Sequence, residues 1–329
     1  MPTSSISDSN DIPPGYAALY EAAGPVIRYR LVRDILGRDD TFIQTMHLGL
    51  ELPRVPEASA LISAQQLDGS WNGVLCSPTV PEPITTESAF LRLCELGLEK
   101  SDTVGACLEK ALMPTLFKQD VLWEFGGQDA ESLRAARQVV RDKVLHMICR
   151  ATRETDEVIK PFLELVIAEW AAYANNPHDA ANVPTWDGYA AVCWFPWSDD
   201  DFERVRKITT RMITVSEERM DWPLTAHPLL APHVFRLSDK WEYLARPQDL
   251  LFELELSSRL GITRDLAVTR WQLDELEARQ DADGWFRFEP GGDVEATWYF
   301  PLEKTTIEDF TVEWTFRGAL IFKLLEYDI

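Results

Sequence analysis

The chain has few of the features that mark secreted, membrane-spanning or nucleic-acid-binding proteins. Its five cysteines form an odd, widely spaced set without a C-x-x-C pair, which is typical of reduced thiols rather than of a disulfide framework. No apolar run reaches the roughly 18 residues that a membrane span requires. The stretch MPTSSISDSNDIPPG has neither a basic region nor an apolar core, so we expect no signal peptide. These features predict a cytoplasmic protein with no transmembrane segment.

Positive charge is also scarce. The 54 acidic residues outnumber the 32 lysines and arginines, which gives a formal charge of −22. A field of that sign repels nucleic acid and anionic membranes, so we expect neither as a partner. The chain of 329 residues is 46% hydrophobic, an ordinary value for a globular protein with a large core. We expect residues 1–14 to form a disordered segment and residues 15–329 to form a single domain.

Helical periodicity is present almost throughout the chain, and no convincing alternating strand pattern occurs. Residues 133–148 and 202–212 place apolar side chains at steps of three or four, with charged residues between them, which predicts amphipathic helices. Residues 161–174 and 314–325 are apolar on nearly every side, a pattern typical of helices buried on several sides. This mixture predicts an all-α fold with an inner and an outer layer of helices.

Two short stretches repeat a turn-like pattern, QQLDGSW at 65–71 and QDADGW at 280–285. Each closes an apolar helical run and precedes a proline-containing connection and a further helix. The glutamine, aspartate and glycine match at a constant offset of 215, and the tryptophan misses it by one residue: Gln65 with Gln280, Asp68 with Asp283, Gly69 with Gly284, Trp71 with Trp285. We expect each glycine to adopt the left-handed conformation just past the helix end and to satisfy its last carbonyls. The pattern predicts one helix–turn–helix unit present twice.

This turn resembles the QW repeat of squalene-hopene and related class II terpene cyclases, whose α/α toroid also occurs in the β subunits of protein prenyltransferases. The resemblance covers roughly residues 50–100 and 265–327, and elsewhere only the general helical texture is similar. It implies an (α/α) barrel, or toroid, of six helical hairpins around an aromatic-lined cavity. It also implies a hydrophobic isoprenoid or polyene substrate, which a general acid would protonate to start cyclisation or isomerisation.

The acid that such a reaction needs is not where the family carries it. No DxDD motif occurs, and in PITTESAF, the stretch that would correspond to it, only Glu87 has a carboxyl group. Near the C-terminus, Asp309 and Glu313 lie within an aromatic-rich stretch. We therefore take Glu87, Asp309 and Glu313 as candidate catalytic acids.

A third group of candidate acids is Asp199, Asp200 and Asp201 in the stretch SDDDFE. Neighbouring carboxylates and burial would raise the pKa of one of them if the stretch folded inward. The same residues also fit a helix start, with Ser198 and Asp201 as a capping pair and acids in the first turn. They also spell the DDxxE pattern that binds magnesium and diphosphate in class I terpene synthases, but no second metal motif accompanies it.

Aromatic residues cluster beside these acids in two stretches, 186–197 and 298–314. Ring faces stabilise a developing carbocation by about 0.5–2 kcal/mol each, depending on desolvation. Aromatic residues also commonly fill cores, and that alternative stays open here. The candidate substrate-binding residues are Trp186, Tyr189, Trp194, Trp197, Trp298, Tyr299 and Trp314.

Other functions remain possible on the sequence alone. His146 and Cys149 lie three residues apart on a predicted helix and could share a zinc ion, but no further ligands are visible, so we expect no metal and no cofactor. The missing DxDD also fits a non-catalytic toroid that binds a lipid or docks a partner. Tryptophans and paired carboxylates would further suit a carbohydrate-active (α/α) barrel.

Overall fold

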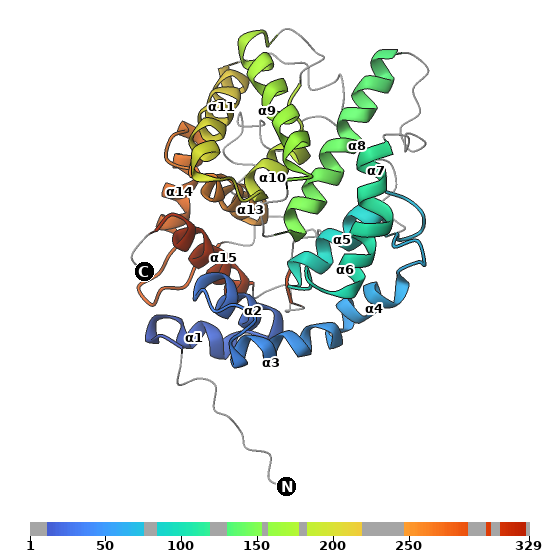
Figure 1. Ribbon diagram of the computed structural model, residues 1–329. Coiled ribbons are helices and arrows are strands. Elements are labelled where there is room, and N and C mark those ends of the chain that lie inside the picture. The colour runs from blue at the N-terminus through green and yellow to red at the C-terminus, as the bar shows by residue number, and fades with distance from the viewer. Residues whose placement is uncertain are drawn as a thin grey trace.

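The structure is a computed structural model in which helices account for most of the described chain (Figure 1). The described residues are 12–75, 84–118, 130–152, 157–177, 183–218, 247–288, 301–303 and 310–326. Within these ranges the only β-type pairing is an isolated bridge between Gln280 and Phe286. The prediction of an all-α fold is therefore confirmed for this part of the chain. Residues 1–11 of the segment expected to be disordered lie outside the described residues.

The chain runs through its helices in the colour order of Figure 1. The first half contains α1 (Pro14–Ala22), α2 (Pro25–Arg30) continuing as the π-helical η2 (Leu31–Ile35), α3 (Ile43–Glu51), η3 (Leu52–Arg54), α4 (Pro56–Ala64), α5 (Thr86–Glu95), α6 (Asp102–Cys107), η4 (Leu108–Leu112) and α7 (Met113–Lys118). The second half contains α8 (Ala130–Ala151), α9 (Lys160–Asn175), α10 (Trp186–Trp194), α11 (Asp199–Glu218), α13 (Pro247–Arg259), α14 (Ala267–Ala278) and α15 (Thr311–Leu324).

The helices differ in how much of their surface is buried. Nearly every residue of α5, α10 and α13 is buried, as are residues 313–322 of α15 and residues 144–151 of α8. By contrast, α14 buries only Thr269, Gln272, Leu273 and Leu276, which recur at helical spacing on one face. The predicted mixture of fully buried and wet-faced helices is present.

One predicted burial was wrong. The segment 161–174 within α9 was expected to be covered on several sides, but its buried residues lie on one face and Leu165 is 48% exposed. This helix packs mainly against α11 and touches α8 and α10 less. An apolar composition does not tell how many neighbours will cover a helix, and here the outward positions carry alanine and leucine in place of charges.

The buried helices pack against one another in chain order. Helix α5 packs on α8, α8 on α10, α10 on α13, α13 on α15, and α15 on η2. Two ion pairs then join the α2–η2 segment to the α5 region, Arg30 to Glu95 and Arg33 to Glu99, both at 2.8 Å. Less buried helices lie against this series, with α3 on α2, α6 on α5, α9 on α8 and α10, and α14 on α13 (Figure 1). Helix α11 packs on α9.

The two repeated turns have the same backbone hydrogen bonds. Gln66 N donates to Ser70 O at 2.9 Å, and Asp281 N donates to Trp285 O at 2.9 Å. The two glutamines related by the offset of 215 make the same side-chain hydrogen bond. Gln65 Nε2 donates to Gly69 O at 3.0 Å, and Gln280 Nε2 donates to Gly284 O at 3.4 Å. The predicted repeat unit is therefore present as a structural repeat of the turn.

The two glycines have the expected left-handed conformation, with φ of 82° at Gly69 and 86° at Gly284. They do not cap the preceding helices, because α4 ends at Ala64 and α14 at Ala278. Each glycine N–H instead closes the turn itself, donating at 3.0 Å to the carbonyl of Gln66 or of Asp281. The expected helix-capping role was wrong, since several residues separate each helix end from its glycine.

The structural equivalent of Trp71 in the second turn is Phe286 rather than Trp285. Trp71 and Phe286 are each 1% exposed and keep the offset of 215. The backbone N–H of each donates at 3.1 Å to a threonine hydroxyl on the following buried helix, Thr86 on α5 or Thr315 on α15. Trp285 instead occupies the position of Ser70. Trp285 misses the offset of 215 because the place of Trp71 is taken by a phenylalanine in the second turn. No residue is inserted or deleted between the two turns.

Candidate functional site

Glu87 lies in a group of four titratable side chains from α5, α8 and α10. It lies in the first turn of α5, where Thr85 and Ser88 form a capping box that fixes the start of the helix. Its Oε1 accepts a hydrogen bond from Lys143 Nζ on α8 at 2.6 Å. Lys143 Nζ also lies 3.0 Å from Asp187 Oδ2 in the first turn of α10, and His146 Nδ1 lies 3.0 Å from Asp187 Oδ1. We call Glu87, Lys143, His146 and Asp187 the acid–base cluster.

The pKa values of the two carboxyl groups in the acid–base cluster are shifted in opposite directions. Burial raises the pKa of Glu87 above its usual value, the Asp187 charge adds to this, and Lys143 only partly opposes it. Burial alone would also raise the pKa of Asp187, but Lys143 and His146 bring it well below its usual range. The surroundings therefore push the pKa values of the two carboxyl groups apart, upward for Glu87 and downward for Asp187. General acid–base chemistry needs such a pair.

The position of Asp187 depends on a neighbouring buried contact between α8 and α10. Thr185 caps α10 by accepting a hydrogen bond from Gly188 N at 2.9 Å, and its hydroxyl donates to Asp142 Oδ2 at 2.6 Å. Burial raises the pKa of Asp142 to about 6, with Arg141 and Thr185 opposing. A Cβ on Gly188 would lie 3.0 Å from Thr185 Oγ1, so this close approach favours glycine. The contact fixes the helix start that carries Asp187.

The three aspartates of SDDDFE form the first turn of α11, with Asp199 and Asp200 exposed. Asp201 accepts a hydrogen bond from Ser198 Oγ at 2.9 Å and pairs with Lys160 Nζ at 2.8 Å. Hydrogen bonds from Lys160, Arg204 and Ser198 hold the pKa of Asp201 well below its usual range. These contacts are those expected if Ser198 and Asp201 form a capping pair at the start of a helix. A carboxyl group with so low a pKa is ionised at neutral pH and has no proton to donate. A catalytic role of these aspartates stays a prediction that their surroundings do not favour.

Glu313 lies apart from the acid–base cluster, at the start of α15. It pairs with Arg317 at 2.9 Å and accepts a hydrogen bond from Leu302 N at 2.7 Å. Burial raises its pKa, and Arg317 opposes the change. The other predicted C-terminal site residues, Asp309, Trp298 and Tyr299, lie outside the described residues.

The described aromatic candidates lie in several surroundings. Trp186 and Tyr189 are next to Asp187 on α10, and the Trp186 ring centroid lies 5.8 Å from that of Tyr189 and 5.7 Å from that of Phe252. Trp197 donates its Nε1 proton to Val192 O at 2.9 Å. Trp314 packs edge-on against Phe288, with centroids 5.2 Å apart. Only Trp186 and Tyr189 flank the acid–base cluster in sequence.

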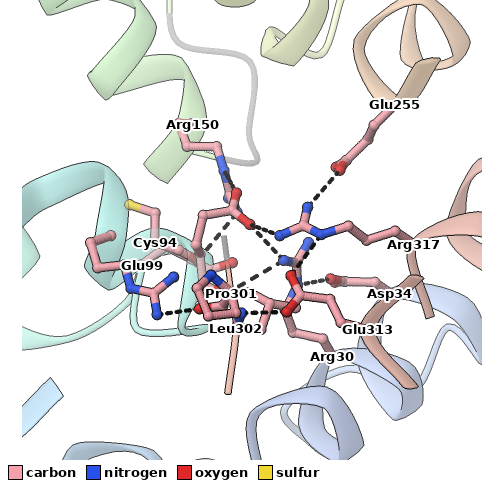
Figure 2. A network of polar contacts seen from close by, with 12 residues as sticks. Arg30, Asp34, Cys94, Glu99, Arg150, Glu255, Pro301, Leu302, Glu313 and Arg317 are labelled. Atoms are coloured by element: carbon pink, nitrogen blue, oxygen red, sulfur yellow. Dashed lines mark hydrogen bonds and ion pairs between the residues drawn. The ribbon is translucent and has the colours of Figure 1, made fainter. Parts of the chain in front are cut away.

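A buried ion-pair network connects four of the buried segments, and the sequence analysis did not foresee it (Figure 2). Glu95 at the end of α5 pairs with Arg30 at 2.8 Å, with Arg150 at 2.8 Å and with Arg317 at 3.6 Å. All four side chains are at most 2% exposed. Although burial alone would raise the pKa of Glu95, the arginines hold it well below its usual range. The signal in the sequence was a charged residue within helices that are otherwise apolar, such as Arg317 in WTFRGALIFKLL.

The described structure adds no further ligands to His146 and Cys149, the two residues that could share a zinc ion. His146 belongs to the acid–base cluster, and Cys149 is buried one turn further along α8. Among the residues that the structure describes, no three His, Cys, Asp or Glu side chains are placed to hold a metal ion. His227 and His233, which flank a proline-rich connection, lie outside the described residues.

Two negative findings concern the class of protein to which the chain belongs. In the ranges with described coordinates, no helix is both long and apolar enough to cross a membrane. Comparison of the chain with family models, with curated proteins and with solved structures gave no match.

Proposed function

We propose that the chain is an (α/α) toroid whose inner ring consists of the α2–η2 segment, α5, α8, α10, α13 and α15. The support is the order of packing, in which α5, α8, α10, α13 and α15 each contact the next and α15 contacts η2. The Arg30–Glu95 ion pair joins the α2–η2 segment to α5. The two equivalent turns at 65–71 and 280–286 each lead from a less buried helix to one of these segments. Such a repeat of outer helix, turn and inner helix is the unit of a toroid.

The reaction that we propose for this toroid is a proton-initiated isomerisation or cyclisation at the acid–base cluster. The observation that carries it is the arrangement in which Lys143 Nζ lies 2.6 Å from Glu87 Oε1 and 3.0 Å from Asp187 Oδ2. In support, burial raises the pKa of Glu87, while Lys143 and His146 lower that of Asp187. Glu87 in its protonated form is the donor. Asp187 stays ionised, with Lys143 and His146 fixing its orientation, and its charge favours a cation formed nearby.

In this scheme the Glu87 proton adds to one carbon of an alkene, whose π electrons form the new C–H bond. The neighbouring carbon becomes a cation, which is attacked by a second alkene or loses an adjacent proton. The proton released at the end returns to the Glu87 carboxylate, so the product has the mass of the substrate. Trp186 and Tyr189 lie within two residues of Asp187 in the sequence and contact each other, and in this proposal their ring faces stabilise the cation by about 0.5–2 kcal/mol each.

The proposed substrate class is a hydrophobic isoprenoid or polyene, as the resemblance of the two turns to the QW repeat implies. The test is incubation of the full chain with farnesyl, geranylgeranyl and longer polyene compounds, followed by mass spectrometry for products of unchanged mass. We expect Glu87→Gln to lower turnover by about a hundredfold or more, because it removes the proton and keeps the shape of the side chain. Asp200→Asn is the matched control and should retain activity, since Asp200 is exposed.

An unchanged rate in Glu87→Gln would overturn this mechanism, and products from no tested polyene would overturn the proposed reaction. The affinity of each variant, measured by tryptophan fluorescence, separates a lost chemical step from lost binding. Far-ultraviolet circular dichroism of the variant shows that its fold is retained.

A non-catalytic toroid that binds a lipid or a partner is the second candidate. The ion-pair network favours it, because charged side chains from α2, α5, α8 and α15 meet where the resemblance implies an aromatic-lined cavity (Figure 2). Saturable binding of a farnesyl compound without any product would support this candidate over the first. Binding of oligosaccharides in the same titration would instead support a carbohydrate-active barrel.

A further inference from the structure

The C-terminal ends of three neighbouring helices bring two arginines to one tryptophan ring. Arg150 is next to the last residue of α8, Trp194 ends α10, and Arg259 ends α13. The guanidinium carbons lie 4.2 Å and 3.6 Å from the centroid of a Trp194 ring for Arg150 and Arg259 respectively. Two cations so close to one ring repel each other unless negative charge compensates them.

Two hydrogen-bond donors at this place have no acceptor within the described part of the chain. Arg150 is 1% exposed, and its Nε and Nη2 donate to Glu95 and to the Cys94 carbonyl, but its Nη1 has no acceptor among the described residues. Trp194 Nε1 is likewise buried without an acceptor. The indole nitrogens of Trp71 and Trp197, by contrast, donate to the carbonyls of Leu61 and Val192. Buried donors normally have acceptors, so two unused ones together point to a missing acceptor.

The nearby carboxylates do not supply this acceptor. Glu95 is shared by Arg30, Arg150 and Arg317. Glu255 pairs with Arg259 at 2.7 Å and also lies 3.9 Å from Arg317. Burial lowers the pKa of Arg259, and the Arg150 charge adds to that effect while Glu255 opposes it. Arg150 and Arg259 therefore each pair with one carboxylate, but Arg150 Nη1 and Trp194 Nε1 have no acceptor among the described residues.

We propose that a small oxyanion, a carboxylate or phosphate group, binds at Arg150, Trp194 and Arg259. Both guanidinium groups and the indole N–H are donors that suit its oxygens, and charge-assisted hydrogen bonds of this kind are the strong ones. Access is through Arg259, whose side chain is 20% exposed, and through the partly buried Trp194. This site uses none of the residues of the acid–base cluster and does not depend on the reaction proposed there.

The test is isothermal titration calorimetry of the full chain with inorganic phosphate and, separately, with acetate. We expect saturable binding of one or both probes, and the comparison tells which oxyanion the site prefers. Arg259→Gln should weaken binding by about tenfold or more, because it removes a charged donor. Trp194→Phe keeps a ring and removes the N–H, and should weaken binding by about fivefold.

Trp197→Phe is the matched control, because Trp197 Nε1 already donates to Val192 O and should not contribute to the site. Its affinity for the probe should equal that of the unmodified chain, and the melting temperature of each variant verifies folding. Equal losses in Trp194→Phe and Trp197→Phe would overturn the proposal. So would the absence of saturable binding of both probes at millimolar concentration, since the unused donors would then only bind water.

Discussion

At the scale of the residue, three carboxyl groups on α5, α8 and α10, of which Asp142 and Asp187 are buried and Glu87 is partly buried, have pKa values shifted in different directions. Glu87 and Asp142 have raised pKa values because burial dominates, whereas the pKa of Asp187 is lowered because Lys143 and His146 both face it. The difference depends on how far neighbouring charges and hydrogen bonds offset burial at each site, not on the residue type. None of it is visible in the sequence, where each carboxyl group is followed or preceded by ordinary helical residues.

A prediction at this scale concerns Asp142 and pH. Its pKa is about 6 in the folded chain against an ordinary value of 3.8, so the folded state holds a proton that the unfolded state releases. Stability from this residue is therefore greatest below pH 4 and falls as the pH rises to about 6, by about 3 kcal/mol at 1.36 kcal/mol for each pH unit. Urea unfolding of Asp142→Asn and of the unmodified chain at several pH values measures this dependence.

The quantity to compare is the difference in unfolding free energy between Asp142→Asn and the unmodified chain at each pH, because other carboxyl groups titrate in both. The substitution should become relatively more favourable as the pH rises through this window, and the difference should be constant above it. A difference that does not change with pH would show that Asp142 does not titrate as expected.

At the scale of the element, the repeated turns determine how an aromatic residue meets the next buried helix. In the second turn, Phe286 packs against Gly318 of α15 so closely that a Cβ on Gly318 would lie 2.7 Å from the Phe286 ring. The same ring lies 5.4 Å from that of Phe322, in an edge-on arrangement. The glycine is therefore required by packing, although glycine ordinarily weakens a helix interior.

Substitution of this glycine tests the packing of the turn. We expect Gly318→Ala to destabilise the chain by about 1–3 kcal/mol, because the ring or the helix must shift. Gly105→Ala on α6 is the matched control, since an added Cβ there would have no tertiary neighbour within 4 Å among the described residues. It should stabilise the chain by about 0.5–1 kcal/mol, as alanine favours a helix. Thermal unfolding of both variants measures the contrast, and a stabilised Gly318→Ala would contradict it.

At the scale of the whole molecule, Glu95 connects segments that are far apart in the chain. Its partners lie on α2, α8 and α15, so one carboxylate joins the first, middle and last helices of the buried series (Figure 2). Charges taken out of water cost free energy, and the network offsets this only while every partner is present. The arrangement therefore favours one relative placement of these helices and disfavours partial packing.

The corresponding prediction is that Glu95→Gln destabilises the chain by about 3–5 kcal/mol, because three buried arginines lose their shared charge. Glu164→Gln is the control, since the Glu164–Arg204 pair is partly exposed and should contribute at most about 1 kcal/mol. Denaturant unfolding followed by tryptophan fluorescence and circular dichroism measures both. Similar small losses for the two variants would show that the network contributes little to holding the helices together.

The sequence alone determined the helical class, the approximate helix positions and the existence of two equivalent turns, because these depend on periodicity and local turn chemistry. It also pointed to Glu87 as a candidate acid. Only the tertiary structure decided which carboxyl groups face cations, which helix sides are covered, and that Phe286 is the counterpart of Trp71. These properties depend on contacts between α5, α8, α10 and α15, whose residues are distant in sequence and whose spacing carries no local signal.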